Sequence, residues 1–394
     1  MSQAFALQLQ GLSTEMQLLL ALTGARNRAD SAAVPDRLFE ETDWNVFVDL
    51  ATHHRVHPYL YYKLKDTEEK RVPPVVFRYF QDEYRRNTFQ MLRLGGEMRT
   101  VDRLLAENGV RALHLKGPAL AEDLYGDVSL RTSCDLDLLI PISDLKKAEH
   151  LLASQGFVKD EYIHSILGDW KWRHHHLTFH HAATGIKVEL HWRLHPAPSG
   201  EPSFDELWAR ARTSSLGSQP IRCLGREDLF QFLVAHGARH GWSRLRWLLD
   251  IKQWLLRPGD ASLLRSLLRK HGYYQVGGQA LALAAGLLGA RVPEGLREMA
   301  EAKRARELAQ AAMFYLERTV NLHSPPVPED VDRYHKRYLF ALMSPGHKLR
   351  FVASFLYPYP EDAETLPLPK ALHVLYFPLR PVLWAWRKAV QGRP

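Results

Sequence analysis

The stretch that decides the fold is RTSCDLDLLI, residues 131–140 of the 394-residue chain. Two acidic residues alternate with leucines at its centre, an aliphatic run follows and Pro141 closes it, which is the pattern of a central β-strand. Side chains two residues apart on a strand point to the same face. Asp135 and Asp137 therefore project side by side, while the leucine that follows each of them points into a core.

Two parallel carboxylates at this spacing repel each other, and a divalent cation relieves that repulsion. Carboxylate oxygens are hard ligands that suit Mg²⁺ or Mn²⁺. An Asp-x-Asp pair is more often the edge of a strand that faces solvent. Here, however, the pair lies in an otherwise apolar strand, where charge is costly to place without a purpose. The pattern therefore favours a metal site at Asp135 and Asp137.

A third acidic residue, Glu189, lies in the motif IKVELHW. Strand-like runs cover residues 174–181 and 186–194, and the short link between them predicts a β-hairpin. Alternation along the second strand places Glu189 on one face together with Lys187 and His191. This face is therefore polar, whereas the opposite face is apolar.

Symmetric closure of the hairpin fixes which residues face one another. It places Thr178 opposite Glu189 and His176 opposite His191. Beside the two aspartates, Glu189 would complete a three-carboxylate site able to hold two metal ions. Two ions are what an in-line phosphoryl displacement uses, one at the attacking oxygen and one at the leaving group.

The rest of the chain is predicted to be mainly helical. Residues 44–65 read as two helices separated near Pro58, and an apolar stripe predicts one long helix over residues 75–108. We therefore expect an α+β fold, in which a small mixed-sheet core is flanked by helical N- and C-terminal regions.

The expected regions are a helical N-terminal part over residues 1–109, a core over 110–200 and a helical C-terminal part over 221–394. Residues 196–220 are rich in proline, serine and glycine, and this composition is typical of a linker.

Several short motifs follow one another along the core. They are, in order, Leu115-Lys116-Gly117, Tyr125, Arg131, DLDLL from Asp135 and VELHW from Val188. In this order they resemble the bacterial uncharacterised nucleotidyltransferase family, which belongs to the DNA-polymerase-beta-like nucleotidyltransferase superfamily. The resemblance is strongest over residues 110–195 and extends more loosely to the flanking helices.

The resemblance implies a minimal nucleotidyltransferase fold and a magnesium (or manganese) cofactor. Asp135 and Asp137 would ligate two ions, and Glu189 would ligate the catalytic metal and help to deprotonate the acceptor hydroxyl. Most members of the superfamily carry Gly-Gly or Gly-Ser after the first strand, where this chain has Lys116-Gly117. A lysine there can bind phosphate by its charge.

Four further side chains are candidates for contacts with the nucleotide. Lys116 and Arg131 are expected at the triphosphate, with a salt bridge to the acidic pair as the alternative role for each. His176 and His191 are expected to line the pocket or to contact the base. Zinc is disfavoured, because consecutive histidines on a strand point to opposite faces and the run 174–176 does not converge on one ion.

Three polar residues of the C-terminal region are interpreted as structural. His236 and His240 share a helix face and are expected to pack together. Asp250 is expected to form an ion pair with Arg244 or Arg246.

Composition bounds the location and the partners. A net charge of +8 favours anionic partners, among them nucleotides and membranes. Two cysteines do not staple a chain of this length, so a cytoplasmic protein is expected. The start, MSQAF, is unlike a secretory signal, and no apolar run is long enough for a membrane span. Residues 372–390 are either an amphipathic segment lying on a membrane surface or a packed terminal helix.

The expected reaction is attack by an acceptor hydroxyl, or another nucleophile, on the α-phosphorus of a nucleoside triphosphate, with release of pyrophosphate. A small molecule, a peptide, a protein and an RNA all remain open as the acceptor. A toxin-like enzyme acting on RNA or tRNA is one alternative. A catalytically silent nucleotide-binding or scaffold protein is another, although a silent site has no reason to hold three repelling acids together.

Overall fold

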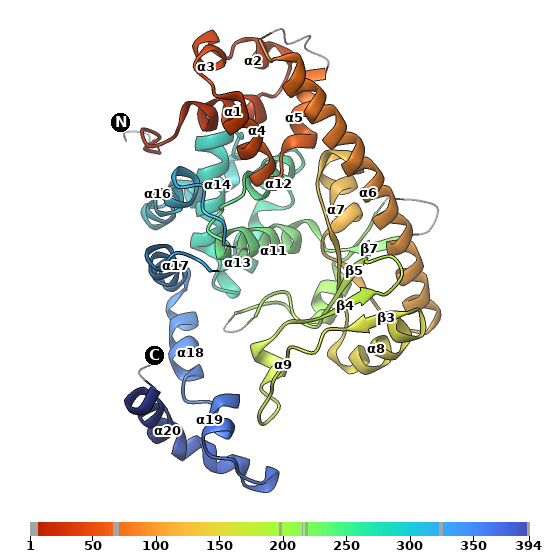
Figure 1. Cartoon of the computed structure of the whole chain (residues 1–394), viewed down its shortest axis with the longest axis vertical. Helices are drawn as coiled ribbons and strands as arrows, with labels where there is room; N and C mark the ends of the chain where they lie inside the picture. The colour runs from red at the N-terminus through yellow and green to blue at the C-terminus, as the bar shows by residue number, and fades with distance from the viewer. Residues whose placement is uncertain are drawn as a thin grey trace.

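Figure 1 shows the computed structural model of the chain. The residues that it describes are 7–65, 71–196, 199–214, 216, 220–322 and 326–391. The extreme N-terminus, on which the expectation about a secretory signal rests, lies outside them.

Seven strands within the described residues form one mixed sheet, in the order β3-β4-β5-β2-β1-β7-β6. Their bounds are β1 (Leu113–His114), β2 (Asp135–Leu139), β3 (Phe157–Lys159), β4 (His176–His181), β5 (Lys187–His191), β6 (Arg212–Ser214) and β7 (Ile221–Cys223). Strands β4 and β5 form the predicted hairpin, and its predicted register is confirmed. Thr178 lies opposite Glu189, and His176 lies opposite His191.

Six helices precede the sheet in the described part of the chain. They are α1 (Thr14–Gly24), α2 (Arg28–Ala32), α3 (Asp36–Glu40), α4 (Trp44–His53), α5 (His57–Lys65) and α6 (Pro74–Glu107). The long predicted helix is confirmed as α6, which runs along the sheet in Figure 1. The predicted break between two helices near Pro58 lies just before that residue, since α5 begins at His57. Proline is tolerated in the first turn of a helix, so Pro58 does not interrupt α5.

Shorter helices connect the strands. They are α7 (Gly117–Tyr125), η1 (Val128–Leu130), η2 (Ile142–Asp144), α8 (Leu145–Ser154), α9 (Trp170–Arg173) and α10 (Phe204–Ala209). The buried stripe of α6, including Met91, Leu94 and Met98, packs in one cluster with Leu136 and Leu138 of β2. Burying these leucines on one face of β2 holds the two aspartates on the other.

The interpretation of residues 196–220 as a linker is corrected in the described part of that range. It contains α10 and β6, and β7 follows at residues 221–223, which were expected to be helical. Strand β7 pairs in parallel with β1, so the sheet extends beyond residue 200. These strands are three residues long and depend on their sheet neighbours rather than on a local pattern, which is why the sequence alone did not indicate them.

The C-terminal region is helical. Its helices are α11 (Arg226–Arg239), α12 (Leu245–Leu256), α13 (Ala261–Lys270), α14 (Tyr274–Leu288), α15 (Glu294–Glu301), α16 (Lys303–Glu317), α17 (Glu329–Leu342), α18 (Pro345–Ser354), α19 (Pro360–Thr365), η3 (Lys370–Leu375) and α20 (Tyr376–Gln391). The expected α+β architecture, a mixed sheet flanked by helices, is thus confirmed. No described helix is both long enough and apolar enough to cross a membrane.

The N-terminal and C-terminal helices share a core rather than forming separate units. Phe47 of α4, Trp254 of α12 and Leu281 of α14 belong to one buried cluster. The ammonium group of Lys252 also donates a hydrogen bond of 3.0 Å to the carbonyl oxygen of Thr23. Helices α18 to α20 extend away from this core in Figure 1.

Candidate active site

The three predicted carboxylates lie on one face of the sheet because β2 and β5 are parallel neighbours. Asp137 is in register with Glu189, and Asp135 is in register with Lys187. Residues in register on adjacent strands point to the same face. The structure therefore brings Asp135, Asp137 and Glu189 together, and it places His191 one step further along the same face.

Asp137 is the buried centre of this group. Its Oδ1 accepts a hydrogen bond of 3.1 Å from the ammonium group of Lys116 and lies 3.1 Å from Nε2 of His191. Its Oδ2 is buried without a hydrogen-bond partner in the described chain. Burial raises the pKa of Asp137, but the positive charge of Lys116 and the contact with His191 outweigh burial and lower it. The side chain is thus an ionised carboxylate with one unused oxygen.

Lys187 bridges the other two acids. Its ammonium group lies 2.7 Å from Oε1 of Glu189 and 3.0 Å from Oδ2 of Asp135. Burial lowers the pKa of Lys187, but the two carboxylates outweigh burial and raise it. The sequence had placed this lysine on the correct face without giving it a role. The available signal was its position, two residues before Glu189 on the same strand.

His191 lies between the carboxylates of Asp137 and Glu189. Its Nε2 lies 3.1 Å from Asp137 and 3.4 Å from Oε2 of Glu189. Burial lowers the pKa of His191, but its hydrogen bonds to these acids outweigh burial and raise it. In turn, burial raises the pKa of Glu189, but His191, with His176 and Lys187, lowers it strongly. Asp137 and Glu189 are therefore ionised at neutral pH.

A divalent cation fits this group of residues. Asp137, Glu189 and His191 each offer a ligand atom, and these atoms lie within 4.8 Å of one another. The unused, buried Oδ2 of Asp137 is a further oxygen donor. Carboxylate oxygens suit Mg²⁺ and Mn²⁺.

The argument from strand alternation against a histidine metal site is corrected. His175, His176 and His191 offer nitrogen atoms within 4.8 Å of one another. His175 precedes the first residue of β4, so the alternation of the strand does not govern its direction. Its Nε2 lies 3.1 Å from Nδ1 of His176, and burial lowers the pKa of His176 to about 4. Burial also lowers the pKa of His175, so both imidazoles are neutral at physiological pH.

Lys116 and Gly117 stand where β1 passes into α7. Gly117 is the first residue of this helix and has a φ of +72°, a conformation that suits glycine. A Cβ atom there would lie 3.5 Å from the backbone oxygen of Asp135. The N-terminus of α7 thus lies against the start of β2, and the N–H groups at a helix N-terminus attract phosphate.

Arg131 does not lie with the charged side chains of β2 and β5. Its guanidinium group is 2% exposed and donates hydrogen bonds of 2.9 and 3.0 Å to the two carboxylate oxygens of Asp250. The hydroxyl of Tyr125 donates to the same carboxylate at 2.8 Å. Asp250 thus forms the expected structural ion pair, but with Arg131. Arg246, one of the two expected partners, donates instead to the backbone oxygen of Thr132.

His236 and His240 pack together as expected. Their ring centroids are 4.7 Å apart, and both rings lie against Trp247. They line the helical side of the core, and burial lowers the pKa of His236 far below its usual range.

Comparison with known proteins gives one match. A family model described as an uncharacterised nucleotidyltransferase matches residues 40–289. No curated protein and no solved structure matches the chain. The matched region includes α4 to α14 and the whole sheet, and therefore all the side chains of the carboxylate site.

Proposed function

The chain belongs to the uncharacterised nucleotidyltransferase family, and nucleotidyl transfer is therefore its activity. We propose that it uses two divalent metal ions to transfer a nucleoside monophosphate from a nucleoside triphosphate to an acceptor. Asp135, Asp137 and Glu189 would hold Mg²⁺ or Mn²⁺, as in the DNA-polymerase-beta-like superfamily. When bound, the metal neutralises the triphosphate and activates the attacking oxygen.

The proposed reaction forms one bond and breaks one. The acceptor oxygen attacks the α-phosphorus, the bond between the α-phosphorus and its bridging oxygen to the β-phosphorus breaks, and pyrophosphate leaves. The acceptor hydroxyl gives its proton to the carboxylate of Glu189. Lys116 and the N-terminus of α7 contact the phosphates, because both lie against the row of acids. His176 and His191 would flank the bound nucleotide, because both lie beside Glu189, and His191 also fixes the orientation of Asp137.

Arg131 is proposed to act through position rather than through the phosphates. Its pair with Asp250 joins the segment before β2 to helix α12, two parts of the chain that are 119 residues apart. The Arg131 side chain is 2% exposed and binds both carboxylate oxygens of Asp250, so its guanidinium group is not accessible to a triphosphate.

One observation carries the proposal: Asp137 is buried, ionised and retains an oxygen without a hydrogen bond. An unpaired buried carboxylate oxygen costs free energy unless it has a ligand. The same observation argues against a catalytically silent scaffold. Transfer to RNA remains an alternative with regard to the acceptor, since the chemistry at the site would be the same.

The test is calorimetric binding of each of the four nucleoside triphosphates with Mg²⁺ and with Mn²⁺. The wild type is compared with Asp137→Asn and with a surface control, Asp332→Asn, whose carboxylate lies in an exposed helical ion pair. Metal-dependent binding by the wild type and the control, and its loss in Asp137→Asn, is the expected result. Equal binding by all three proteins would overturn the assignment of the site.

A second proposal concerns the membrane, and it rests on helix α20. This helix packs on α19 and η3 within a small separate cluster that includes Tyr376 and Leu383. Trp384 and Trp386 of this helix are exposed, and so are Val382 and Val390. Exposed tryptophans beside apolar residues are typical of segments that lie in the membrane interface.

Flotation with vesicles of phosphatidylcholine and phosphatidylglycerol tests peripheral membrane contact. The full-length wild type is expected to float with the vesicles, and the full-length double variant Trp384→Ser/Trp386→Ser is expected to remain at the bottom. Equal behaviour of the two proteins would remove the proposal. The variant leaves the carboxylate site intact, so nucleotide binding serves as the folding control.

A further inference from the structure

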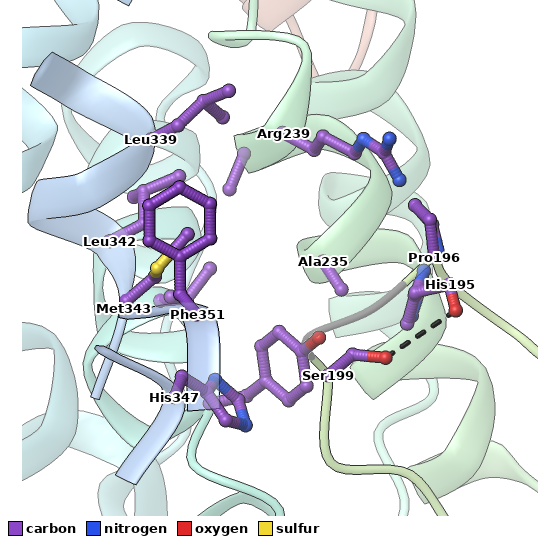
Figure 2. A pocket seen from close by; sticks show the side chains of 13 residues that line it. His195, Pro196, Ser199, Ala235, Arg239, Leu339, Leu342, Met343, His347 and Phe351 are labelled. Carbon is purple, nitrogen blue, oxygen red and sulfur yellow. Dashed lines mark hydrogen bonds between the residues drawn. The ribbon is translucent and has the colours of Figure 1, made fainter. Parts of the chain in front are cut away.

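A second feature of functional interest is a cavity of about 230 Å³ beside the carboxylate site. Figure 2 shows it between helix α11 and the segment that follows β5 on one side, and helices α17 and α18 on the other. Its volume is below the range of about 300–1,000 Å³ that is typical of sites for drug-sized ligands. The cavity therefore suits a molecule smaller than a nucleoside triphosphate.

One side of the cavity is apolar. Leu342 and Met343, at the end of α17, and Phe351 of α18 form this wall, which Ala235 of α11 faces in Figure 2. These side chains offer only carbon and sulfur atoms. An occupant therefore has an apolar body, because a polar body would lose its hydrogen bonds with water without replacement.

The other side carries polar groups that lack partners. His195 is 6% exposed, and its Nε2 is buried without a hydrogen bond in the described chain. Arg239 is an exposed residue at the rim, with its guanidinium group on the side of His195, and it forms no ion pair or hydrogen bond with the described residues. The hydroxyl of Tyr273 likewise has no hydrogen-bond partner among them. The unpaired buried nitrogen of His195, with an exposed cation beside it, indicates a ligand that has a polar group.

The cavity adjoins the carboxylate site through one aromatic ring. His195 stacks on Phe232, with ring centroids 5.6 Å apart and planes inclined by 16°. On the same phenyl ring, the ammonium group of Lys116 lies 5.6 Å from the centroid, and Lys116 also binds Asp137. The wall of the cavity and the buried aspartate are thus connected by only two intervening side chains.

We propose that this cavity binds the acceptor, and that the acceptor is a small molecule with an apolar or aromatic body and a carboxylate group. The inference rests on the proposed nucleotidyl transfer and names its second substrate. The Arg239 guanidinium group would bind the carboxylate in a bidentate manner, and Phe351 and its apolar neighbours would enclose the body. His195 and Tyr273 would bind the remaining polar atoms.

A single unpaired guanidinium group matches one carboxylate. A triphosphate carries more charge than one arginine at the rim neutralises, and the cavity is small for it. We therefore assign the nucleotide to the site formed by Asp135, Asp137 and Glu189, and the acceptor to the cavity. An RNA acceptor is disfavoured by the same comparison, because a polyanion requires several cations along its backbone.

The test uses two probes with the same aromatic body. 4-Hydroxyphenylacetate carries a carboxylate, whereas tyrosol carries a hydroxyl group in its place, and both retain a phenolic hydroxyl. Calorimetry measures the Kd of each probe for the wild type, for Arg239→Gln and for a control, Arg333→Gln, whose guanidinium lies in an exposed helical ion pair. The wild type and the control are expected to bind the acid about tenfold more tightly than the alcohol. This is the gain in affinity expected from a hydrogen bond between the charged guanidinium and carboxylate groups.

In Arg239→Gln this preference is expected to disappear while the affinity for tyrosol stays the same. A variant that fills the cavity, Ala235→Leu, is expected to weaken the binding of both probes. An unchanged preference in Arg239→Gln, or no binding of either probe by the wild type, would overturn the proposal. Asp137→Asn separates the two hypotheses, because it is expected to lose metal-nucleotide binding and to retain the binding of the acid.

Discussion

The ammonium group of Lys187 lies 2.7 Å from Oε1 of Glu189 and stands between this carboxylate and that of Asp135. A cation of the chain therefore occupies the position where a metal ion is proposed to bind. Lys187 is 29% exposed, so its flexible side chain has a path toward solvent. Metal binding and this ion pair are thus alternatives, and the lysine keeps the carboxylates from repelling one another when the metal is absent.

Replacing Lys187 by methionine tests this competition. The variant retains the bulk of the side chain and removes its charge, so a metal ion no longer has to displace an ammonium group. The affinity for Mn²⁺ is expected to rise about tenfold, which corresponds to about 1.4 kcal/mol. Without metal, the melting temperature is expected to fall, because Asp135 and Glu189 then repel each other.

Calorimetric titration with Mn²⁺ and thermal unfolding with and without the metal measure these two effects. Lys146→Met on the exposed face of α8 is the matched control, and both quantities are expected to stay constant there. Weaker metal binding by Lys187→Met would show that the lysine supports the site rather than competing for it.

Asp137→Asn is expected to abolish turnover while leaving the fold intact. Asparagine retains the size of the side chain and an oxygen that accepts a hydrogen bond from Lys116, but it loses the charge that the metal requires. Turnover of labelled nucleoside triphosphate into pyrophosphate is the measurement, with circular dichroism as the check on folding. Activity near that of the wild type would exclude Asp137 as a metal ligand.

The grouping of the carboxylates was predictable because it depends on local rules. Alternation places Asp135 and Asp137 on one face, and a short link fixes the register of β4 against β5. Both follow from residues that are close in the sequence. The parallel pairing of β2 with β5 was a further step, and it needed only the expectation that one small sheet contains both strands.

What the sequence did not indicate depends on contacts between distant segments. The pair of Arg131 and Asp250 joins residues 119 positions apart, and no pattern near either residue identifies the other. The cavity has the same origin, since α11, α17 and α18 meet only in the folded chain. The histidine cluster was missed for a different reason: the alternation rule was applied to His175, which lies just outside the strand.

Asp250→Asn is expected to destabilise the protein strongly. It leaves the charge of Arg131 buried without its counter-ion, and breaking a buried pair from one side costs about 3–5 kcal/mol. Urea unfolding followed by circular dichroism gives the free energy of unfolding. The control is Asp330→Asn, which breaks an exposed pair with Arg318 and is expected to change the free energy of unfolding far less, because solvent screens this pair.

Arg131→Lys asks whether this arginine also binds phosphate. Lysine retains the charge but lacks the fork that binds both oxygens of Asp250, so the protein is again expected to be less stable. The affinity of the folded protein for metal-nucleotide is expected to change less than threefold. A tenfold loss of that affinity would show that Arg131 contacts the triphosphate after all.

The protein is expected to become less stable as the pH falls, and His57 in α5 is expected to cause part of this loss. Burial lowers the pKa of His57 to about 4, and its Nδ1 is buried without a hydrogen bond in the described chain. In the unfolded chain the imidazole is protonated below about pH 6.5. Between these two values the unfolded state binds one proton more than the folded state, so the free energy of unfolding decreases as the pH falls from about 6.5 to about 4.

The full shift corresponds to about 3 kcal/mol, from about 1.4 kcal/mol for each pH unit. His57→Leu removes the group, and the slope of unfolding free energy against pH in this window is expected to become smaller than in the wild type. His150→Leu, on α8 and outside the buried core, is the control and should leave the slope as it is. Other buried histidines, such as His54, act in the same direction, so the comparison rests on the difference between the two slopes. If His57→Leu and the wild type show the same slope, the imidazole is not held neutral by burial, and the acid sensitivity arises elsewhere in the core.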